Sequence, residues 1–86
     1  MTAFALRRHV TATETEHATV LFDQRRGRYY QLNPTGALIL RVLQDGGGPQ
    51  GAARALRERY GIPVARAEAD VASLVDTLHR TRLAER

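Results

Sequence analysis

Few side chains in this 86-residue sequence have the type and spacing that catalysis or metal binding requires. The histidines His9, His17 and His79 are isolated, with no pair at metal-ligand spacing. Ser73 lies six residues before His79, so the two would not meet on one helix face. The sequence contains no cysteine, which excludes thiol nucleophiles, disulfides and thiolate metal sites. We therefore predict no catalytic residues, no metal and no other cofactor.

Two other groups of residues fail as chemical motifs for physical reasons. Glu14 and Glu16 would share one strand face, but the stretch around them is too polar to bury them and shift their pKa values. The glycines at positions 46–48 lack the following lysine and hydroxyl residue of a phosphate-binding loop, and they do not follow a strand. The sequence is thus typical of a non-catalytic protein.

The element that organises the chain is the stretch RYYQLNPTG, residues 28–36. Its two tyrosines and Leu32 suit a half-buried β-strand. Asn33 can cap a first helical turn, and Pro34 then takes the first helical position, where its missing N–H costs nothing. The sequence predicts a strand that leads directly into a helix.

The residues before this junction have β character. A weak alternation predicts a first strand from Phe4 to about Val10, and the polar stretch Thr11–Glu16 predicts a loop or a ragged strand end. His17–Asp23 predicts a better strand, and Gln24–Gly27 a hairpin turn with glycine at its end. Arg28–Leu32 would return as the partner strand, at one edge of a two- or three-stranded antiparallel meander.

The residues after the junction predict three helices. Pro34 to about Gln44 is apolar on nearly all sides, and the glycines and proline of Asp45–Pro49 end it. Gln50–Tyr60 and Ala65 to about Thr81 are amphipathic, and Leu83 would extend the core. The pattern predicts an α+β fold, similar to a winged helix-turn-helix with its β-part first.

Composition favours one small cytoplasmic domain, residues 1–86, with its core from about residue 4 to residue 83. The chain is 43% hydrophobic, enough for a single core. Arg7 and Arg8 interrupt the N-terminal apolar residues too early for a signal peptide, and no apolar run could cross a membrane.

The formal net charge is +4, and all thirteen basic residues are arginine. Arginine enrichment is typical of a GC-rich genome, and a nucleic-acid surface is the alternative interpretation. The arginines are spread along the chain, and only Arg25, Arg26 and Arg28 form a local cluster. The candidate recognition helix offers Arg66 and then carboxylates, which would face phosphates. A winged-helix DNA-binding regulator therefore remains the second hypothesis, and an accessory subunit docked by its edge strand the third.

Recognition of another polypeptide is the first hypothesis. An exposed strand edge is a template for a further strand, and a groove between Arg28–Leu32 and Ala65–Thr81 would add side-chain contacts. Its apolar floor and polar rim would be Val71, Leu74 and Leu78 with Asp70 and Thr77. Tyr29 and Tyr30 would supply rigid contact area. The alternative is that one tyrosine and the three apolar helix residues are internal packing.

Several short motifs, in this order and spacing, resemble the PqqD-like family of precursor-peptide recognition elements. They are Leu21, Asp23 and Gly27, Tyr30-x-Leu-Asn-x-Thr-Gly36, Tyr60-Gly61, and Asp70-Val71-x-x-Leu74-x-x-x-Leu78. The resemblance covers about residues 17–84 and is greatest to the stand-alone recognition proteins of lasso-peptide biosynthesis. The sequence departs from the family at Arg80-Thr81-Arg82-Leu83, where many members have Gly-Leu. The resemblance therefore does not predict the conformation of this terminal turn.

The resemblance implies a three-stranded antiparallel sheet packed on three helices, which binds the leader segment of a precursor peptide as an extra strand. The residues that it assigns to the leader are Arg28, Tyr29, Tyr30, Gln31 and Leu32 of the strand, with Asp70, Val71, Leu74 and Leu78 of the last helix. The other implied partners are a transglutaminase-like cysteine protease, which removes the leader, and an ATP-dependent cyclase. Neither nucleic acid nor a membrane is an expected partner. The cluster Arg25, Arg26 and Arg28 is a candidate contact for the protease.

Overall fold

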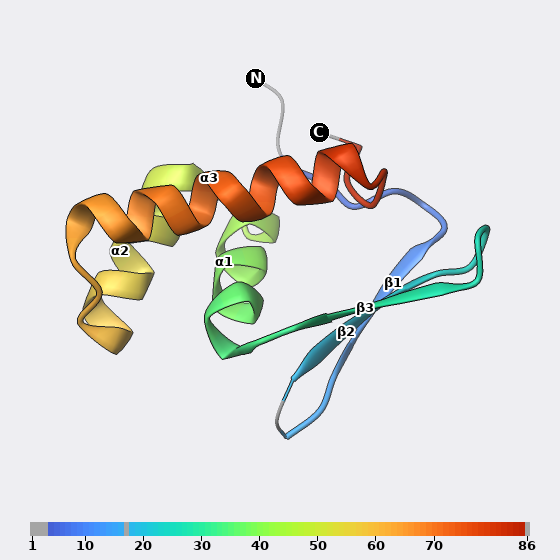
Figure 1. Ribbon diagram of the computed structural model, residues 1–86, viewed down its shortest axis with the longest axis horizontal. Coiled ribbons are helices and arrows are strands. Elements are labelled where there is room, and N and C mark those ends of the chain that lie inside the picture. Colours follow the sequence, from blue (N-terminus) through green and yellow to red (C-terminus); the bar gives the residue numbers. More distant parts are fainter. Residues whose placement is uncertain (1–3, 17, 86) are drawn as a thin grey trace.

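The computed structural model describes residues 4–16 and 18–85, and it has an antiparallel sheet followed by three helices (Figure 1). The elements are β1 Val10–Glu14, β2 Thr19–Asp23, β3 Arg28–Leu32, α1 Pro34–Gln44, α2 Gly48–Tyr60 and α3 Val64–Arg80. In Figure 1, α3 lies across the other two helices, and the β2–β3 hairpin projects away from the helices beyond the C-terminal end of α3. The predicted α+β class is confirmed, with three strands.

The sheet has the order β1-β2-β3, and both neighbouring pairs are antiparallel. On β2, Thr19, Leu21 and Asp23 are buried on the face toward the helices, while the alternating residues face outward. The turn after β2 ends at Gly27, whose φ of 65° is in the left-handed region that favours glycine. The predicted hairpin and the edge position of Arg28–Leu32 are confirmed.

The prediction for the first strand was wrong. The strand is Val10–Glu14, within the stretch expected to be a loop, and Phe4 and Leu6 precede it. Only Val10 of β1 is buried, so this edge strand has no apolar alternation that a sequence pattern could detect. The apolar residues Phe4 and Leu6 instead pack against the core, and Leu6 forms a β-bridge with Ala84. His17, expected to start the second strand, lies outside the described residues.

The junction between β3 and α1 has the predicted cap. The Asn33 side chain accepts a hydrogen bond from the Gly36 amide at 2.8 Å, and Pro34 occupies the first turn. The other helices agree with the prediction within two residues, since α2 begins at Gly48 and α3 at Val64. Gly61 ends α2 with a φ of 65°. The direction in which the chain leaves β3 is therefore fixed by local hydrogen bonding.

Two groups of buried side chains form the core. The sheet cluster joins the sheet to the helices and includes Val10, Leu21, Leu32, Leu40, Leu78 and Leu83. The helix cluster joins the three helices and includes Ile39, Leu43, Ala52, Leu56, Ala67 and Val71. Helices α1 and α3 contribute to both clusters, and Leu74 of α3 packs against both. These two helices consequently hold the sheet and α2 in one arrangement.

The chain continues after α3 in a tight, ordered turn. The amides of Leu83 and Ala84 both donate to the Leu78 carbonyl oxygen, at 2.8 and 3.0 Å, and Leu83 is fully buried. Arg82 adopts a φ of 63°, the one described non-glycine residue with positive φ. The departure from the Gly-Leu of many family members therefore leaves the turn intact, with arginine in a conformation that favours glycine.

We expect Arg82→Gly to stabilise the protein. Glycine adopts the left-handed conformation without the steric cost that a Cβ imposes, although it loses more chain entropy on folding. The net gain in the free energy of unfolding should be about 0.5–1 kcal/mol. Urea denaturation of both proteins measures it, and Arg80→Gly, which places glycine in the helical last turn of α3, should be destabilising instead. Equal stability of the Arg82 variant and the parent would contradict the strain argument.

Asp23 organises the β2–β3 turn from a fully buried position. Its Oδ1 accepts hydrogen bonds from the amides of Arg25 and Arg26 at 3.0 and 3.1 Å, and His9 Nε2 lies 3.5 Å away. Burial opposes ionisation of this carboxyl, but the two amides and the nearby charges of His9 and Arg26 hold its pKa below the ordinary value. The ionised carboxylate is therefore the form that stabilises the turn.

The lowered pKa of Asp23 gives the protein an acid-sensitive contribution to stability. A carboxyl with a lower pKa in the folded state stabilises above its unfolded pKa, about 4, and this stabilisation is lost as pH falls through the folded pKa. We expect Asp23→Asn to unfold at a lower temperature than the parent at pH 6, and the difference to shrink toward pH 3. Thermal unfolding followed by circular dichroism tests this. A difference that stays constant with pH would show that ionisation is not involved.

Candidate functional site

The candidate binding surface consists of the free edge of β3 and the side of α3 that faces it. Among the described residues, no strand pairs with β3 on the side away from β2. At the start of β3, Arg28 Nη2 donates to the Thr81 carbonyl oxygen at 3.5 Å, just beyond the end of α3. The same guanidinium lies 5.5 Å from the centre of the Tyr30 ring. The Arg28 side chain thereby connects one end of β3 to the turn that follows α3.

A groove of about 420 Å³ lies where the end of β3 and the start of α1 face α3. The first wall consists of Gln31, Leu32, Asn33, Thr35, Gly36 and Ile39. The second wall is one side of α3, with Arg66, Asp70, Ser73, Leu74 and Thr77. The α3 residues recur every three or four positions, so they form one stripe along the helix. The groove thus has apolar residues at its base and polar groups along the helix rim.

The groove contains some of the predicted site residues and not others. Gln31, Leu32, Asp70 and Leu74 line it as expected, together with Thr77. Val71 and Leu78, expected in the floor, are core residues with exposed fractions of 2% and 1%, and they do not line it. The physical reason is that α3 packs on both core clusters, which requires its most apolar stripe. The groove receives the neighbouring, more polar stripe.

Sequence reasoning missed several residues of the groove. Arg66 and Ser73 belong to the polar stripe of α3, which could have been found by taking the helix positions adjacent to the apolar stripe. Residues 33–36 were interpreted only as a helix start. Because the cap turns the chain into α1 beside α3, these residues also line the groove.

The two tyrosines of β3 occupy opposite faces of the sheet. Tyr29 lies on the outer face, stacked on Phe22 with ring centres 4.5 Å apart, and is 69% exposed. Tyr30 pairs with Leu21 and packs, half-buried, against the sheet cluster. Neither side chain lines the groove, and nor does that of Arg28. These three residues therefore border the free edge through their main chain.

Asp70 is the acidic group of the groove, and it is half-buried. Arg66 lies one turn earlier on α3, at the spacing of a helical ion pair. Within the described residues, the Asp70 side chain forms neither an ion pair nor a hydrogen bond. The carboxylate is therefore available to a group that enters the groove.

The chemistry of this site is that of recognition. The strand edge offers main-chain N–H and C=O groups, Leu32 and Leu74 offer apolar contact, and Asp70 offers a hydrogen-bond acceptor. The described residues contain no group of three or more metal-binding side chains. Such a surface fits an extended peptide that adds one strand to the sheet. No helix in the described part of the chain is long and apolar enough to span a membrane.

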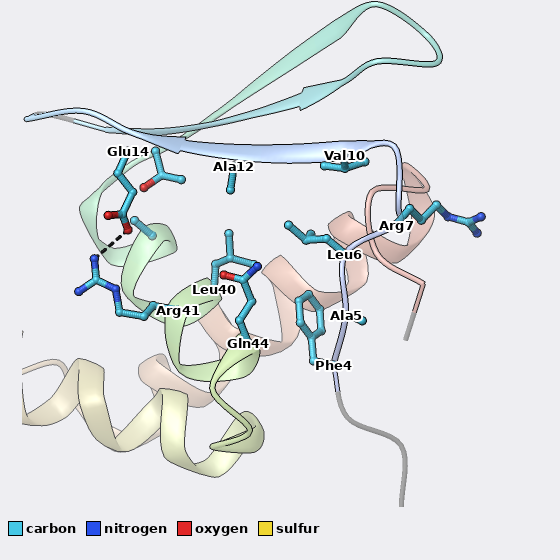
Figure 2. Close-up of a pocket in the computed structure, with 12 residues that line it drawn as sticks. Phe4, Ala5, Leu6, Arg7, Val10, Ala12, Glu14, Leu40, Arg41 and Gln44 are labelled. Carbon is cyan, nitrogen blue, oxygen red and sulfur yellow. Dashed lines mark hydrogen bonds and ion pairs between the residues drawn. The ribbon is translucent and has the colours of Figure 1, made fainter.

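A larger cavity, of about 750 Å³, lies at the opposite edge of the sheet, between β1 and α1. Figure 2 shows Ala12 of β1 facing Leu40 of α1 across it, with Phe4 and Leu6 at one end. At the other end Arg41 Nη2 and Glu14 Oε1 form an ion pair at 2.8 Å. This cavity was not predicted, because β1 was misplaced in the sequence. It is a second place where a ligand could bind.

Comparison with known proteins decides the family. The model of the family described as coenzyme PQQ synthesis protein D (PqqD) matches residues 18–84. The chain belongs to the PqqD family. This family was expected from the sequence motifs, and the matched residues include all of them. No curated protein sequence matches the chain.

Two solved structures are similar to this member of the PqqD family. One, described as lasso peptide synthetase B1 complexed with the leader peptide, is 38% identical, with a TM-score of 0.91. The match covers 99% of this chain and 100% of that one. The other, described as TbiB1 in complex with the TbiA(beta) leader peptide, is 22% identical, with a TM-score of 0.85 and 94% of both chains covered. The second match shows the fold alone.

Proposed function

We propose that this PqqD-family chain binds the leader segment of a ribosomally made precursor peptide and delivers it to a separate leader peptidase in lasso-peptide biosynthesis. One observation carries the proposal: over nearly its whole length the chain is 38% identical to a lasso peptide synthetase B1 that is complexed with a leader peptide. The free β3 edge beside the α3 groove supplies a binding surface of the right form. The chain acts as a non-catalytic recognition domain.

The bound leader forms a fourth strand along β3. Residues Arg28–Leu32 supply main-chain hydrogen bonds, each contributing about 1 kcal/mol net. A handful of such bonds offsets only part of the entropy lost when a disordered peptide becomes ordered. Micromolar affinity corresponds to about −8 kcal/mol, so side-chain anchors must supply much of the rest. The leader therefore needs apolar residues that fill the groove.

The groove side chains select those anchors. Leu32 and Leu74 contact apolar or aromatic leader residues, and Val71 and Leu78 shape the floor from behind. Asp70, which has no partner among the described residues, accepts a hydrogen bond or pairs with a cation of the leader. The outer-face residue Tyr29 keeps the β3 edge rigid through its stacking on Phe22.

The chemical steps then belong to other proteins. A transglutaminase-like cysteine protease cleaves the leader from the precursor that the domain holds, and an ATP-dependent cyclase closes the ring. Holding the leader as a strand raises the local concentration of the attached precursor near these enzymes. Binding and delivery require no catalytic residue or cofactor of this chain.

We expect Ser73→Arg to weaken binding of the leader at least tenfold. Ser73 is exposed on the groove side of α3, so a long charged side chain fills the groove without disturbing the core. The measurement is the fluorescence anisotropy of a labelled leader segment from the precursor encoded beside this protein. Leu74→Arg should abolish binding too, but Leu74 packs against both core clusters, so its folding must be verified by circular dichroism.

Ala12→Arg is the matched control. It places the same side chain in the cavity between β1 and α1, and we expect the affinity for the leader to be unchanged. Loss of binding in Ala12→Arg but not in Ser73→Arg would move the site to the β1 side. Failure of the parent protein to bind the leader, combined with salt-sensitive binding of duplex DNA, would replace the proposal by a DNA-binding regulator.

A further inference from the structure

The fold gathers arginines that are far apart in the sequence at one end of the molecule. The Gln24 amide donates to the His9 carbonyl oxygen at 2.9 Å, and the Arg7 amide to the Leu83 carbonyl oxygen at 2.9 Å. The N-terminal segment thus lies between the β2–β3 turn and the C-terminal turn. A hollow of about 530 Å³ at this end is lined by Arg7, Arg8, His9, Gln24, Arg25 and Glu85.

Arg26 follows Arg25 in the β2–β3 turn, and the Arg28 guanidinium reaches the Thr81 carbonyl oxygen, next to Arg82. We call this region the basic end and define it by Arg7, Arg8, Arg25, Arg26, Arg28 and Arg82. None of these six arginines forms an ion pair with the described residues. Asp23 is buried and accepts hydrogen bonds from the turn amides, and Glu85 is the one described acid that lines the hollow. The positive charge of the basic end is therefore largely uncompensated.

Arg7 contributes a polar group that the described part of the fold leaves without a partner. Its Nε is buried and has no hydrogen-bond partner among the described residues. Figure 2 shows its guanidinium pointing away from the cavity between β1 and α1, and Arg7 also lines the hollow of the basic end. Unsatisfied buried donors are rare in folded proteins, because each one costs free energy.

The basic end is continuous with the free edge of β3. Arg28 is both the first residue of β3 and a member of the basic end, and its guanidinium reaches the Thr81 carbonyl oxygen. A peptide paired with β3 has one end beside Leu32 and Asn33 and the other beside Arg28. The segment that leaves the strand at the Arg28 end must therefore pass the arginines of the β2–β3 turn and the C-terminal turn.

We propose that the basic end binds Asp and Glu side chains in the precursor segment that flanks the bound strand beside Arg28. This inference rests on the proposed function and specifies its substrate class: a leader with apolar anchors for the groove and an acidic flank on one side. Arginine fits the role because its planar guanidinium bonds carboxylates with two parallel hydrogen bonds. The groove selects the strand, and the basic end selects its flank and direction.

A peptide fits this surface better than nucleic acid does. The side of α3 that adjoins the groove carries Asp70, which would repel a phosphate backbone lying along the helix. The six arginines come from two turns, the first position of β3 and an N-terminal segment, so they form a compact end rather than a stripe along a helix. A short carboxylate-bearing segment matches that extent.

The test uses three labelled peptides that share one leader segment. The first peptide has three glutamines added at each end. The second has three glutamates in place of the N-terminal glutamines, and the third has three glutamates in place of the C-terminal glutamines. We expect one of the glutamate peptides to bind about three- to tenfold more tightly than the glutamine peptide. The other glutamate peptide should bind as tightly as the glutamine peptide. The gain should disappear in 0.5 M salt, because exposed charges are screened.

Paired variants of equal charge locate the effect. Arg8→Glu with Arg25→Glu should remove the gain and leave binding of the glutamine peptide unchanged, since both side chains are exposed and lie outside the groove. Arg54→Glu with Arg57→Glu, on the exposed face of α2, makes the same change in net charge and should keep the gain. Retention of the gain in the first pair, or its loss in both, would overturn the proposal.

The remaining outcomes separate this proposal from the proposed function. Equal affinity of all three peptides, or an equal gain from both glutamate peptides, overturns the acidic flank while leaving leader binding in place. No binding of any peptide overturns leader binding itself. Binding of a 20-base-pair DNA duplex that is tighter than that of every peptide, and that is lost in Arg8→Glu with Arg25→Glu, would assign the basic end to nucleic acid.

Discussion

The placement of α3 opposite the free edge of β3 is the constraint on which the other features depend. Ala67 and Val71 fix the first half of α3 against α1 and α2, and Leu78 fixes its second half against the sheet. Leu83, buried after the left-handed turn, prevents the end of the helix from moving away. Since close-packed interiors resist deformation, the distance between helix and strand is set by these contacts, and the groove exists before any peptide binds.

This packing also determines which residues can serve recognition. A helix that joins two core clusters must bury its most apolar stripe, so Val71 and Leu78 are used for stability and only the adjacent stripe faces the groove. Leu74 lies at the boundary of the two stripes and takes part in both. A substitution of Leu74 therefore affects both folding and binding. Ser73 is exposed, so a substitution there affects binding without affecting the core.

The sequence predicted correctly those parts of the fold that depend on interactions within a few residues. The Asn33 cap, the proline after it and the glycine turn before β3 fix conformation within a few residues, and all three were predicted correctly. Strand β1 was not, because an exposed edge strand is stabilised by its partner and needs no pattern of its own. The groove lining was predicted in part, since periodicity identifies the apolar stripe but not its neighbour. Of the basic end, the sequence showed only the local cluster Arg25, Arg26 and Arg28, because Arg7, Arg8 and Arg82 are distant in the sequence and join that cluster only in the fold.

A domain of this size has too little interior for a deep active site, and strand addition is the kind of recognition that it can afford. Main-chain pairing tolerates many sequences, so specificity must come from the groove and from charge at the end of the strand. The two contributions differ in physical character: apolar contact in the groove is insensitive to salt, whereas pairing at the basic end is weakened by it. Because exposed ion pairs form and break readily, the proposed contacts at the basic end would orient the precursor without making its release slow. Under the proposed function, in which the precursor passes to a separate enzyme, moderate and oriented binding is the combination required.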